Sequence, residues 1–268
     1  MSTPSPNRLS RRLSIEKPSG ASLAAIIDEP AEAAIARVVF AHCFTCGKDL
    51  KMIVRLSRML ASAGIVVLRF DMTGIGDSDG DFSQTNFLTQ MDDLRSVIEY
   101  FDAQWSEPLF LIGHSFGGAT SLAVTQDSES VRGTITIAAP SDTWHLARTL
   151  EGMNPDIESA GQGEVTIGGR SFLIDRQMLR QFREYDLDAR IRAIQKPILA
   201  MHSPDDETVA FWHASRIVGP TSGDDSRHAL PRSLIALPGS DHLFLKDPRD
   251  LEFASKVIVA WIERLAGE

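Results

Sequence analysis

The sequence lacks any long apolar run: its 268 residues contain no stretch of about 18 consecutive apolar residues. No apolar signal core follows the N-terminus either, so we expect no membrane association and a cytoplasmic location. The opening residues are rich in Ser and Arg and contain no acid before Glu16, as in organelle transit peptides. We favour the simpler interpretation that residues 1–8 are disordered and that a strand follows.

The chain also lacks a basic block. Its 27 Lys and Arg residues are outnumbered by 36 Asp and Glu residues, which gives a formal net charge of −9 and an isoelectric point near 5.3. A nucleic-acid partner requires a clustered cationic surface, so no such partner is expected. An acidic exterior is more compatible with a small, neutral molecule as the partner.

Cysteine is scarce, since Cys43 and Cys46 are the only two. Two cysteines are too few for the disulfide framework of a secreted domain. Their spacing is C-x-x-C, but a zinc site needs two further ligands of suitable spacing, so we expect no metal and no other cofactor. Two interpretations stay open: a thiol redox pair, or small residues in the wall of a site.

Short apolar runs alternate with segments of helical period from residue 37 onward. This alternation is typical of parallel strands joined by crossover helices, and continuous apolar character predicts a sheet buried on both faces. The predicted strands cover residues 38–41, 65–70, 109–112, 133–138, 197–201 and 233–237. The predicted helices cover residues 49–63, 86–104, 116–127, 207–218 and 249–266.

Two segments depart from this alternation. Residues 12–17 alternate between polar and apolar, and an apolar stretch over 23–27 follows a turn, which predicts an N-terminal antiparallel hairpin. Residues 141–196 are too many for a loop and contain helical segments and a hairpin over 164–174, so we interpret them as a cap insertion. We therefore predict that residues 1–268 form a single α/β domain with a mostly parallel sheet and helices on both faces.

The pentapeptide at 113–117 has the pattern G-x-S-x-G, with Ser115 at its centre. An apolar strand precedes it and a helical segment follows, which is the context of a nucleophilic serine on a strand-to-helix turn. Glycine is needed on both sides because a side chain would collide in so sharp a turn. This context favours a nucleophile over a glycine-rich turn of purely structural meaning.

A serine hydroxyl needs a base, and the base needs an acid to orient it. His242 follows the last predicted strand, where strand ends face the active edge of a parallel sheet. Two adjacent aspartates, Asp205 and Asp206, lie between Ser115 and His242 after the preceding strand. The order Ser, acid, His is that of the strand-turn-helix serine hydrolases, and we predict Asp206 as the acid with Asp205 as the alternative.

The negative oxygen of a tetrahedral intermediate requires backbone N–H donors. Phe116, directly after the nucleophile, is one expected donor, and Phe44, in a loop after an early strand, is the other. Cys43, His114 and Trp144 are expected to line the substrate pocket. Trp144 and the two phenylalanines suggest an apolar acyl pocket, although ordinary packing explains them equally well.

Three further stretches carry a resemblance to a known family. They are F-A-H-C-F-T-C-G-K-D at 40–49, L-R-F-D-M-T-G-I-G-D-S at 68–78 and H-S-P-D-D-E-T-V at 202–209. With the motif around Ser115, they resemble the α/β-hydrolase superfamily, and more narrowly the hydrolase domain of bacterial proteins fused to an OsmC-like domain. The resemblance implies an α/β-hydrolase fold, a Ser-His-Asp triad and hydrolase activity. Cys43 stands where the early loop of the family has a glycine.

These patterns lead us to expect a serine hydrolase that cleaves a carboxylic ester or related acyl compound through an acyl-enzyme intermediate. Acyl transfer and perhydrolysis use the same triad and stay open. Two further hypotheses are a redox-responsive regulatory protein that uses Cys43 and Cys46, and a noncatalytic binding protein on the same fold. Labelling by a fluorophosphonate probe separates the catalytic hypotheses from the noncatalytic one.

Overall fold

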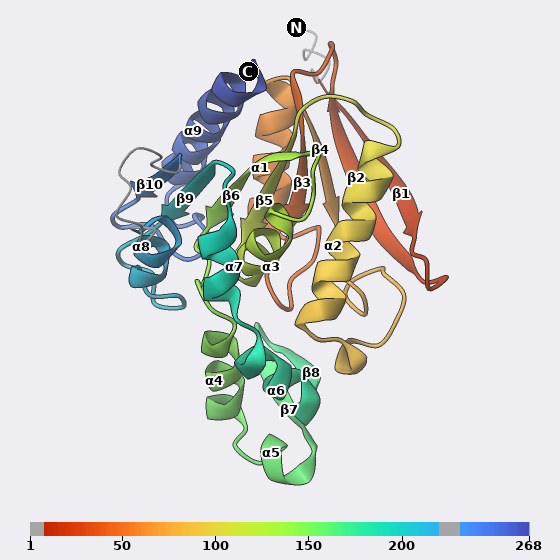
Figure 1. Cartoon of the computed structure of the whole chain (residues 1–268), viewed down its shortest axis with the longest axis vertical. Coiled ribbons are helices and arrows are strands. Elements are labelled where there is room, and N and C mark those ends of the chain that lie inside the picture. The colour runs from red at the N-terminus through yellow and green to blue at the C-terminus, as the bar shows by residue number, and fades with distance from the viewer. Residues whose placement is uncertain (1–7, 220–230, 268) are drawn as a thin grey trace, which may run out of the picture.

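A computed structural model describes residues 8–219 and 231–267. Its centre is an eight-stranded sheet in the order β1-β2-β4-β3-β5-β6-β9-β10 (Figure 1). The strands are β1 (Arg8–Glu16), β2 (Ser22–Pro30), β3 (Ala36–Ala41), β4 (Ile65–Phe70), β5 (Leu109–His114), β6 (Val131–Ile137), β9 (Ile198–His202) and β10 (Arg232–Ala236). The pairs β1–β2 and β2–β4 are antiparallel, and the remaining neighbours are parallel. The predicted mostly parallel sheet with an N-terminal antiparallel hairpin is confirmed.

Helices cover both faces of this sheet, as predicted. They are α1 (Lys51–Ser62), α2 (Phe87–Asp102), α3 (Phe116–Thr125), α8 (Trp212–Val218) and α9 (Pro248–Ala266). Alternate residues of a strand face opposite layers: Val38 and Phe40 pack with α1 and α9, whereas Val39 packs with α2 and α3. Because β3, β4 and β5 are buried along their whole length, the sheet is open to a ligand only at the strand ends.

One predicted helix begins later than the sequence pattern indicates. The expected helix over 207–218 starts only at Trp212. The Oδ1 atom of Asp206 accepts the backbone N–H groups of Thr208 and Val209, and this local turn competes with a helical start. The residues directly after β9 therefore form a loop at the strand end.

Most of the segment between β6 and β9 lies beyond the carboxyl ends of the parallel strands, in the lower part of Figure 1, and its last helix returns beside α3. It contains α4 (Trp144–Met153), α5 (Ile157–Ala160), β7 (Gln162–Ile167), β8 (Arg170–Asp175), α6 (Arg176–Glu184) and α7 (Leu187–Ala193). The antiparallel pairing of β7 with β8 corresponds to the predicted hairpin. Phe172 of β8 packs edge-on against Phe82, with ring centroids 5.2 Å apart, so the segment is attached to the main body by apolar contacts. The division of the chain into one domain with a cap stays a prediction.

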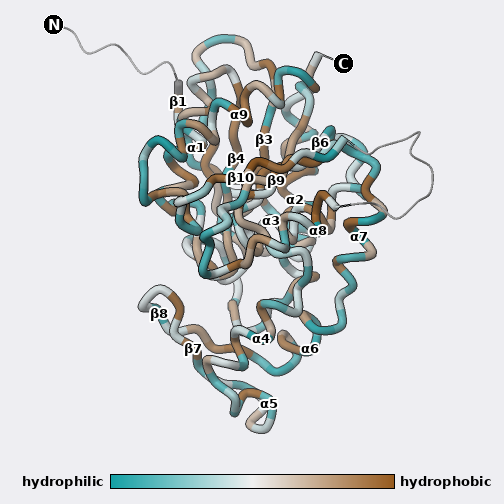
Figure 2. Tube along the Cα trace, turned by 90° about the vertical axis from the view of Figure 1, so that its left-hand side faces the viewer, coloured by the Kyte–Doolittle hydropathy of each residue, from teal (hydrophilic) through white to brown (hydrophobic). Residues whose placement is uncertain are grey.

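Hydrophobic residues are concentrated in the sheet: the most apolar stretches of the trace run through the central strands (Figure 2). Among the helices of residues 8–219 and 231–267, none is long and apolar enough to cross a membrane. The disorder expected over residues 1–8 falls outside the described residues, except for Arg8, which begins β1.

Candidate active site

Ser115 lies in the turn between β5 and α3. Its φ of +53° is in the left-handed region that residues other than glycine rarely adopt. Two backbone hydrogen bonds of 2.8 Å hold the turn: the N–H of Ser115 donates to the Ile137 carbonyl, and the N–H of Gly118 donates to the Ser115 carbonyl. A serine held in this strained conformation matches the geometry expected of a nucleophile on a strand-to-helix turn.

The glycines beside Ser115 permit close contacts between backbone segments. A Cβ atom on Gly113 would lie 2.3 Å from the carbonyl oxygen of Gly117. A Cβ atom on Gly117 would lie 2.3 Å from the carbonyl oxygen of His42. No side chain fits at either position, so the turn can approach the end of β3 only with glycine there.

His242 and Asp206 are in direct contact. The Nδ1 atom of His242 lies 2.7 Å from Oδ2 of Asp206, and the Asp206 side chain is fully buried whereas that of His242 is 16% exposed. Burial alone would raise the pKa of Asp206, but hydrogen bonds from His202, His242 and the N–H of Val209 hold this pKa far below its ordinary value. An ionised Asp206 orients the imidazole with its proton on Nδ1, which leaves Nε2 available as a base.

The neighbouring carboxylate, Asp205, occupies a different place. Its Oδ2 atom accepts the backbone N–H of Gly239 at 2.7 Å. Asp241 likewise accepts the N–H groups of Leu245 and Lys246, at 2.7 and 2.9 Å. Both carboxylates therefore hold the turn that carries His242, and of the two adjacent aspartates only Asp206 contacts the imidazole.

Ser115 and His242 line one cavity of about 980 Å³. One wall comes from the loop after β3, with Cys43, Phe44 and further residues up to Cys46. The opposite wall comes from the segment beyond the strand ends, and its apolar members are Leu146, Leu150, Met153 and Ile167. The volume suits a small organic molecule with an apolar part.

The loop after β3 places Phe44 against other aromatic rings. Its ring packs edge-on against those of Phe82, Phe116 and Phe182, with centroids 5.2 to 5.7 Å apart. Cys43 and Cys46, on either side of it, are joined by a disulfide with their Cα atoms 5.3 Å apart. The loop that carries one expected oxyanion donor is thus closed into a small covalent ring. The other expected donor, the N–H of Phe116, is at the first position of α3, where N–H groups lack partners within the helix.

His42 connects this loop to the loop after β4. Its Nδ1 atom donates to the carbonyl of Cys43 at 2.6 Å, and its Nε2 atom accepts the N–H of Met72 at 3.0 Å. Burial lowers the pKa of His42, so the ring stays neutral and keeps this donor-acceptor pair at neutral pH. The role of His42 is to hold backbone in place.

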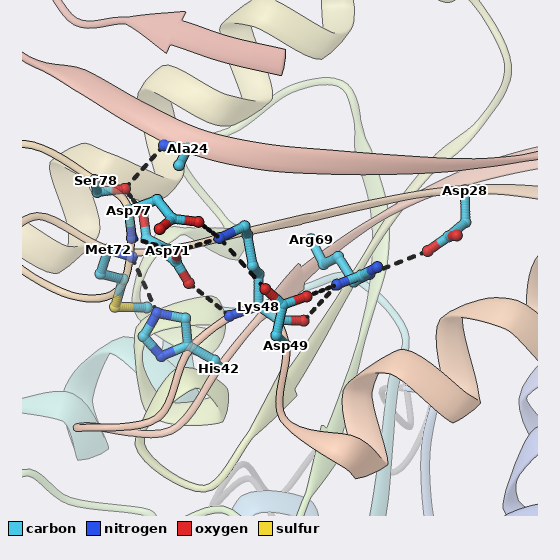
Figure 3. A network of polar contacts seen from close by, with 10 residues as sticks. All are labelled: Ala24, Asp28, His42, Lys48, Asp49, Arg69, Asp71, Met72, Asp77 and Ser78. Atoms are coloured by element: carbon cyan, nitrogen blue, oxygen red, sulfur yellow. Dashed lines mark hydrogen bonds and ion pairs between the residues drawn. The ribbon is translucent and has the colours of Figure 1, made fainter. Parts of the chain in front are cut away.

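A network of charges, centred on the buried side chains of Lys48, Asp71 and Arg69, supports the same two loops (Figure 3). Lys48 lies between Asp71 and Asp77, with its Nζ atom 2.6 and 2.7 Å from their Oδ2 atoms. Asp71 also accepts the backbone N–H groups of Lys48 and Asp77. Arg69 lies between Asp49 and Asp28, at 2.8 and 3.1 Å. Asp71 thereby holds its own turn, and the sequence pattern did not predict its lysine partner.

Two of the expected pocket residues lie elsewhere. His114 has no exposed surface, and its Nε2 atom donates to the backbone carbonyl of His242 at 3.0 Å. Trp144 is 48% exposed and lines a different cleft, since it begins α4 on the side away from Ser115. Of the three residues expected in the pocket, Cys43 alone is found among the described residues that line the cavity.

Comparison with known proteins identifies similar chains. Residues 32–155, less than half of the chain, match the family described as serine aminopeptidase, S33. The esterase domain of a Rhodothermus marinus protein is 35% identical in sequence, with a TM-score of 0.75 over 96% of this chain and 99% of that domain.

Two curated proteins are more distant. The protein YfhR of Escherichia coli O157:H7 is 25% identical over 219 residues, which are 80% of this chain and 65% of that protein. The mitochondrial palmitoyl-protein thioesterase ABHD10 of Rattus norvegicus is 25% identical over 195 residues, which are 68% of this chain and 64% of that protein. The chain thus spans slightly less than two thirds of the length of these relatives.

The buried lysine gives the first prediction. Replacing Lys48 with Met leaves the carboxylate of Asp71 buried without its cation, so we expect the free energy of unfolding to fall by about 3 kcal/mol. Urea denaturation measures this loss. Lys51→Met, at an exposed position of α1, is the control and should change stability by less than about 0.5 kcal/mol. Equal losses in the two variants would contradict a stabilising role for the buried pair.

The second prediction concerns His114. Burial, reinforced by the nearby His242, lowers the pKa of His114 to about 3, against an ordinary value of 6.5. The unfolded chain therefore binds this proton at a higher pH than the folded chain, and stability falls as the pH falls from about 6.5 towards 3. Between pH 7 and pH 5 this group accounts for a loss of about 2 kcal/mol.

In His114→Asn this part of the pH dependence should disappear. The measurement is the free energy of unfolding in urea at both pH values, for the variant and for the unchanged protein. The pKa of His42 is also lowered by burial, and this histidine remains in both proteins, so only the difference between them reports on His114. An unchanged slope of stability with pH would show that His114 does not titrate in this window.

Proposed function

The chain belongs to the α/β-hydrolase superfamily, and from this premise we propose that it is a serine hydrolase that cleaves carboxylic esters or thioesters of apolar acids. Hydrolase activity is what the family and the similarity to an esterase domain support. The observation that carries the finer proposal is the contact of His242 with Asp206 beside a cavity that Ser115 also lines. The acyl substrate is a small molecule, and the reaction as proposed uses no metal or organic cofactor.

In the proposed reaction, Ser115 attacks the carbonyl carbon of the substrate while Nε2 of His242 takes the hydroxyl proton. Asp206 stabilises the imidazolium that forms. The N–H groups of Phe116 and Phe44 donate hydrogen bonds to the developing oxyanion. The imidazolium then protonates the leaving group, and an acyl-enzyme remains on Ser115.

Water completes the cycle by the same steps in reverse. His242 takes a proton from a water molecule, the resulting hydroxide attacks the acyl-enzyme, and the second tetrahedral intermediate uses the same oxyanion donors. Collapse of this intermediate releases the acid and returns the proton to Ser115. The strained turn at Ser115 holds the Oγ atom in place, as the nucleophile of the first attack and as the leaving group of the second.

The cavity favours an apolar acyl group. Leu146, Leu150 and Met153 follow one another at helical spacing on α4, so they present one continuous apolar face to the cavity. An acyl chain on this face removes apolar surface from water, at about 0.8 kcal/mol for each buried methylene. The relatives named for esterase and palmitoyl-protein thioesterase activity are consistent with such substrates.

Loss of the nucleophile is the third prediction. Ser115→Ala should lower kcat/KM for p-nitrophenyl esters by at least about a thousandfold. In the unchanged protein, kcat/KM should be higher for butanoyl to octanoyl esters than for acetyl esters. A thioester series and an aminoacyl anilide series, assayed in parallel, identify the leaving group. Ser128→Ala, remote from the cavity, is the matched control and should keep its activity. An active Ser115→Ala protein, or a fluorophosphonate label on another residue, would refute the proposed nucleophile.

The disulfide supports a second candidate function, control of the same activity by redox state. Cys43 and Cys46 bracket Phe44, whose N–H is the proposed oxyanion donor. Opening the disulfide removes a covalent constraint from this short loop, and a misplaced donor weakens transition-state stabilisation.

The fourth prediction follows from this candidate. Reduction with dithiothreitol should lower kcat/KM by about tenfold, the expected size for a partly misplaced oxyanion donor. The double variant Cys43→Ser, Cys46→Ser should have the activity of the reduced form and should not respond to reductant. Thiol titration confirms which state is present in each assay. Equal activity of the oxidised and reduced forms would exclude redox control through this pair.

A further inference from the structure

A second cleft, of about 570 Å³, lies next to the active-site cavity. It forms where α4 and α8 begin, because these helices follow the neighbouring parallel strands β6 and β9. Of the described residues that line the cleft, only Thr149 also lines the cavity of Ser115. The imidazole of His145 in the cleft donates from Nε2 to the carbonyl of Thr208 in the cavity, at 3.1 Å. This hydrogen bond and α4 therefore adjoin both spaces.

The lining of this cleft combines exposed indole rings with guanidinium groups. Trp144 is 48% exposed and Trp212 is 49% exposed, an unusual degree for so large an apolar side chain. The guanidinium carbon of Arg148 lies 4.8 Å from the ring centroid of Trp144, and that of Arg216 lies 5.6 Å from the ring of Trp212. Such pairs present aromatic surface and positive charge together.

The two arginines differ in what they bind. Arg216 has carboxylates nearby, with Asp188 at 3.2 Å and Asp142 at 3.7 Å. Arg148 has no carboxylate within ion-pair distance among residues 8–219 and 231–267. The Arg148 guanidinium therefore has N–H donors available for an anion. It provides a local positive charge although the net charge of the chain is −9.

His213 adds a second donor without a partner. Only 1% of its surface is exposed, and its Nδ1 atom accepts the backbone N–H of Ser141 at 3.0 Å, so the neutral ring carries its proton on Nε2. Within the described residues, this buried Nε2 has no hydrogen-bond partner. Burial lowers the pKa of His213 to about 4, despite the raising effect of Asp142, so the ring is neutral at pH 7.

From these observations we propose that the cleft is a binding site for a planar aromatic carboxylate. The aromatic part stacks on the indole rings, and the carboxylate accepts hydrogen bonds from the guanidinium of Arg148 and from Nε2 of His213. Asp142 is the carboxylate among the described residues that line the cleft, and its Oδ1 atom already accepts the backbone N–H of His145 at 2.8 Å. This inference needs neither Ser115 nor His242, and it is independent of the proposed hydrolysis.

The test is a titration with 2-naphthoate, followed through the indole N–H signals in ¹H–¹⁵N correlation spectra of the ¹⁵N-labelled protein. Single Trp→Phe variants assign the signals. Saturable shifts are expected for Trp144 and Trp212. Trp105 is a matched internal control, because Arg11 lies 5.6 Å from its ring but Trp105 is not among the residues that line this cleft, and its signal should stay in place.

Neutral 2-naphthamide, of nearly the same shape, should bind at least about tenfold more weakly than 2-naphthoate, because it lacks the charge that Arg148 recognises. Arg148→Gln should weaken naphthoate binding by a similar factor. Arg58→Gln, at an exposed position of α1, should bind as the unchanged protein does. Ser115→Ala should bind naphthoate with the affinity of the unchanged protein. Its loss of hydrolysis is measured separately, in the ester assay.

Three results would overturn the proposal. The first is the absence of saturable shifts at Trp144 and Trp212, or shifts of equal size at Trp105. The second is equal affinity for the acid and the amide, which would remove the role of the charge. The third is unchanged affinity in Arg148→Gln, which would place the anion elsewhere.

Discussion

The contact between Gly117 and the end of β3 is the constraint on which the site depends. Because a Cβ on Gly117 would lie 2.3 and 2.4 Å from the carbonyl oxygens of His42 and Ala41, the backbones of two segments touch with no room for a side chain. This contact places the turn of Ser115 against the loop that carries Phe44. The loop residues and the proposed nucleophile therefore share one cavity as a direct consequence of backbone packing.

A loop in this position has no sheet partners, so other interactions must satisfy its polar groups. His42 supplies one such interaction by joining Cys43 to Met72, and the carboxylate of Asp71 supplies another by binding the N–H and the ammonium group of Lys48. Removing two charges from water is costly, and the buried pair persists because each group finds several hydrogen-bond partners. The charges beneath the loop thus determine its geometry, while the residues that face the cavity determine what binds.

A short continuous motif and the order of residues along the chain made much of this site predictable from the sequence. The turn at Ser115 is a continuous five-residue motif, and the chain order after it selected Asp206 and His242, whose contact the structure shows. The orientation of side chains and the contacts between residues far apart in the sequence could not be predicted from it. Apolar periodicity could not show that His114 is fully buried or that Lys48 contacts Asp71, 23 residues away in the sequence. The start of α8 was missed because hydrogen bonds from a side chain, rather than apolar spacing, decide where that helix begins.

The helix α4 connects the two spaces at the strand ends. Its residues at 146, 150 and 153 face the active-site cavity, whereas those at 144, 145 and 148 face the cleft. Positions three and four apart share a helix face, so the two sets of residues lie on different faces of this one helix. Thr149 lies on the boundary and contributes to both. A displacement of α4 would therefore change the walls of both spaces together.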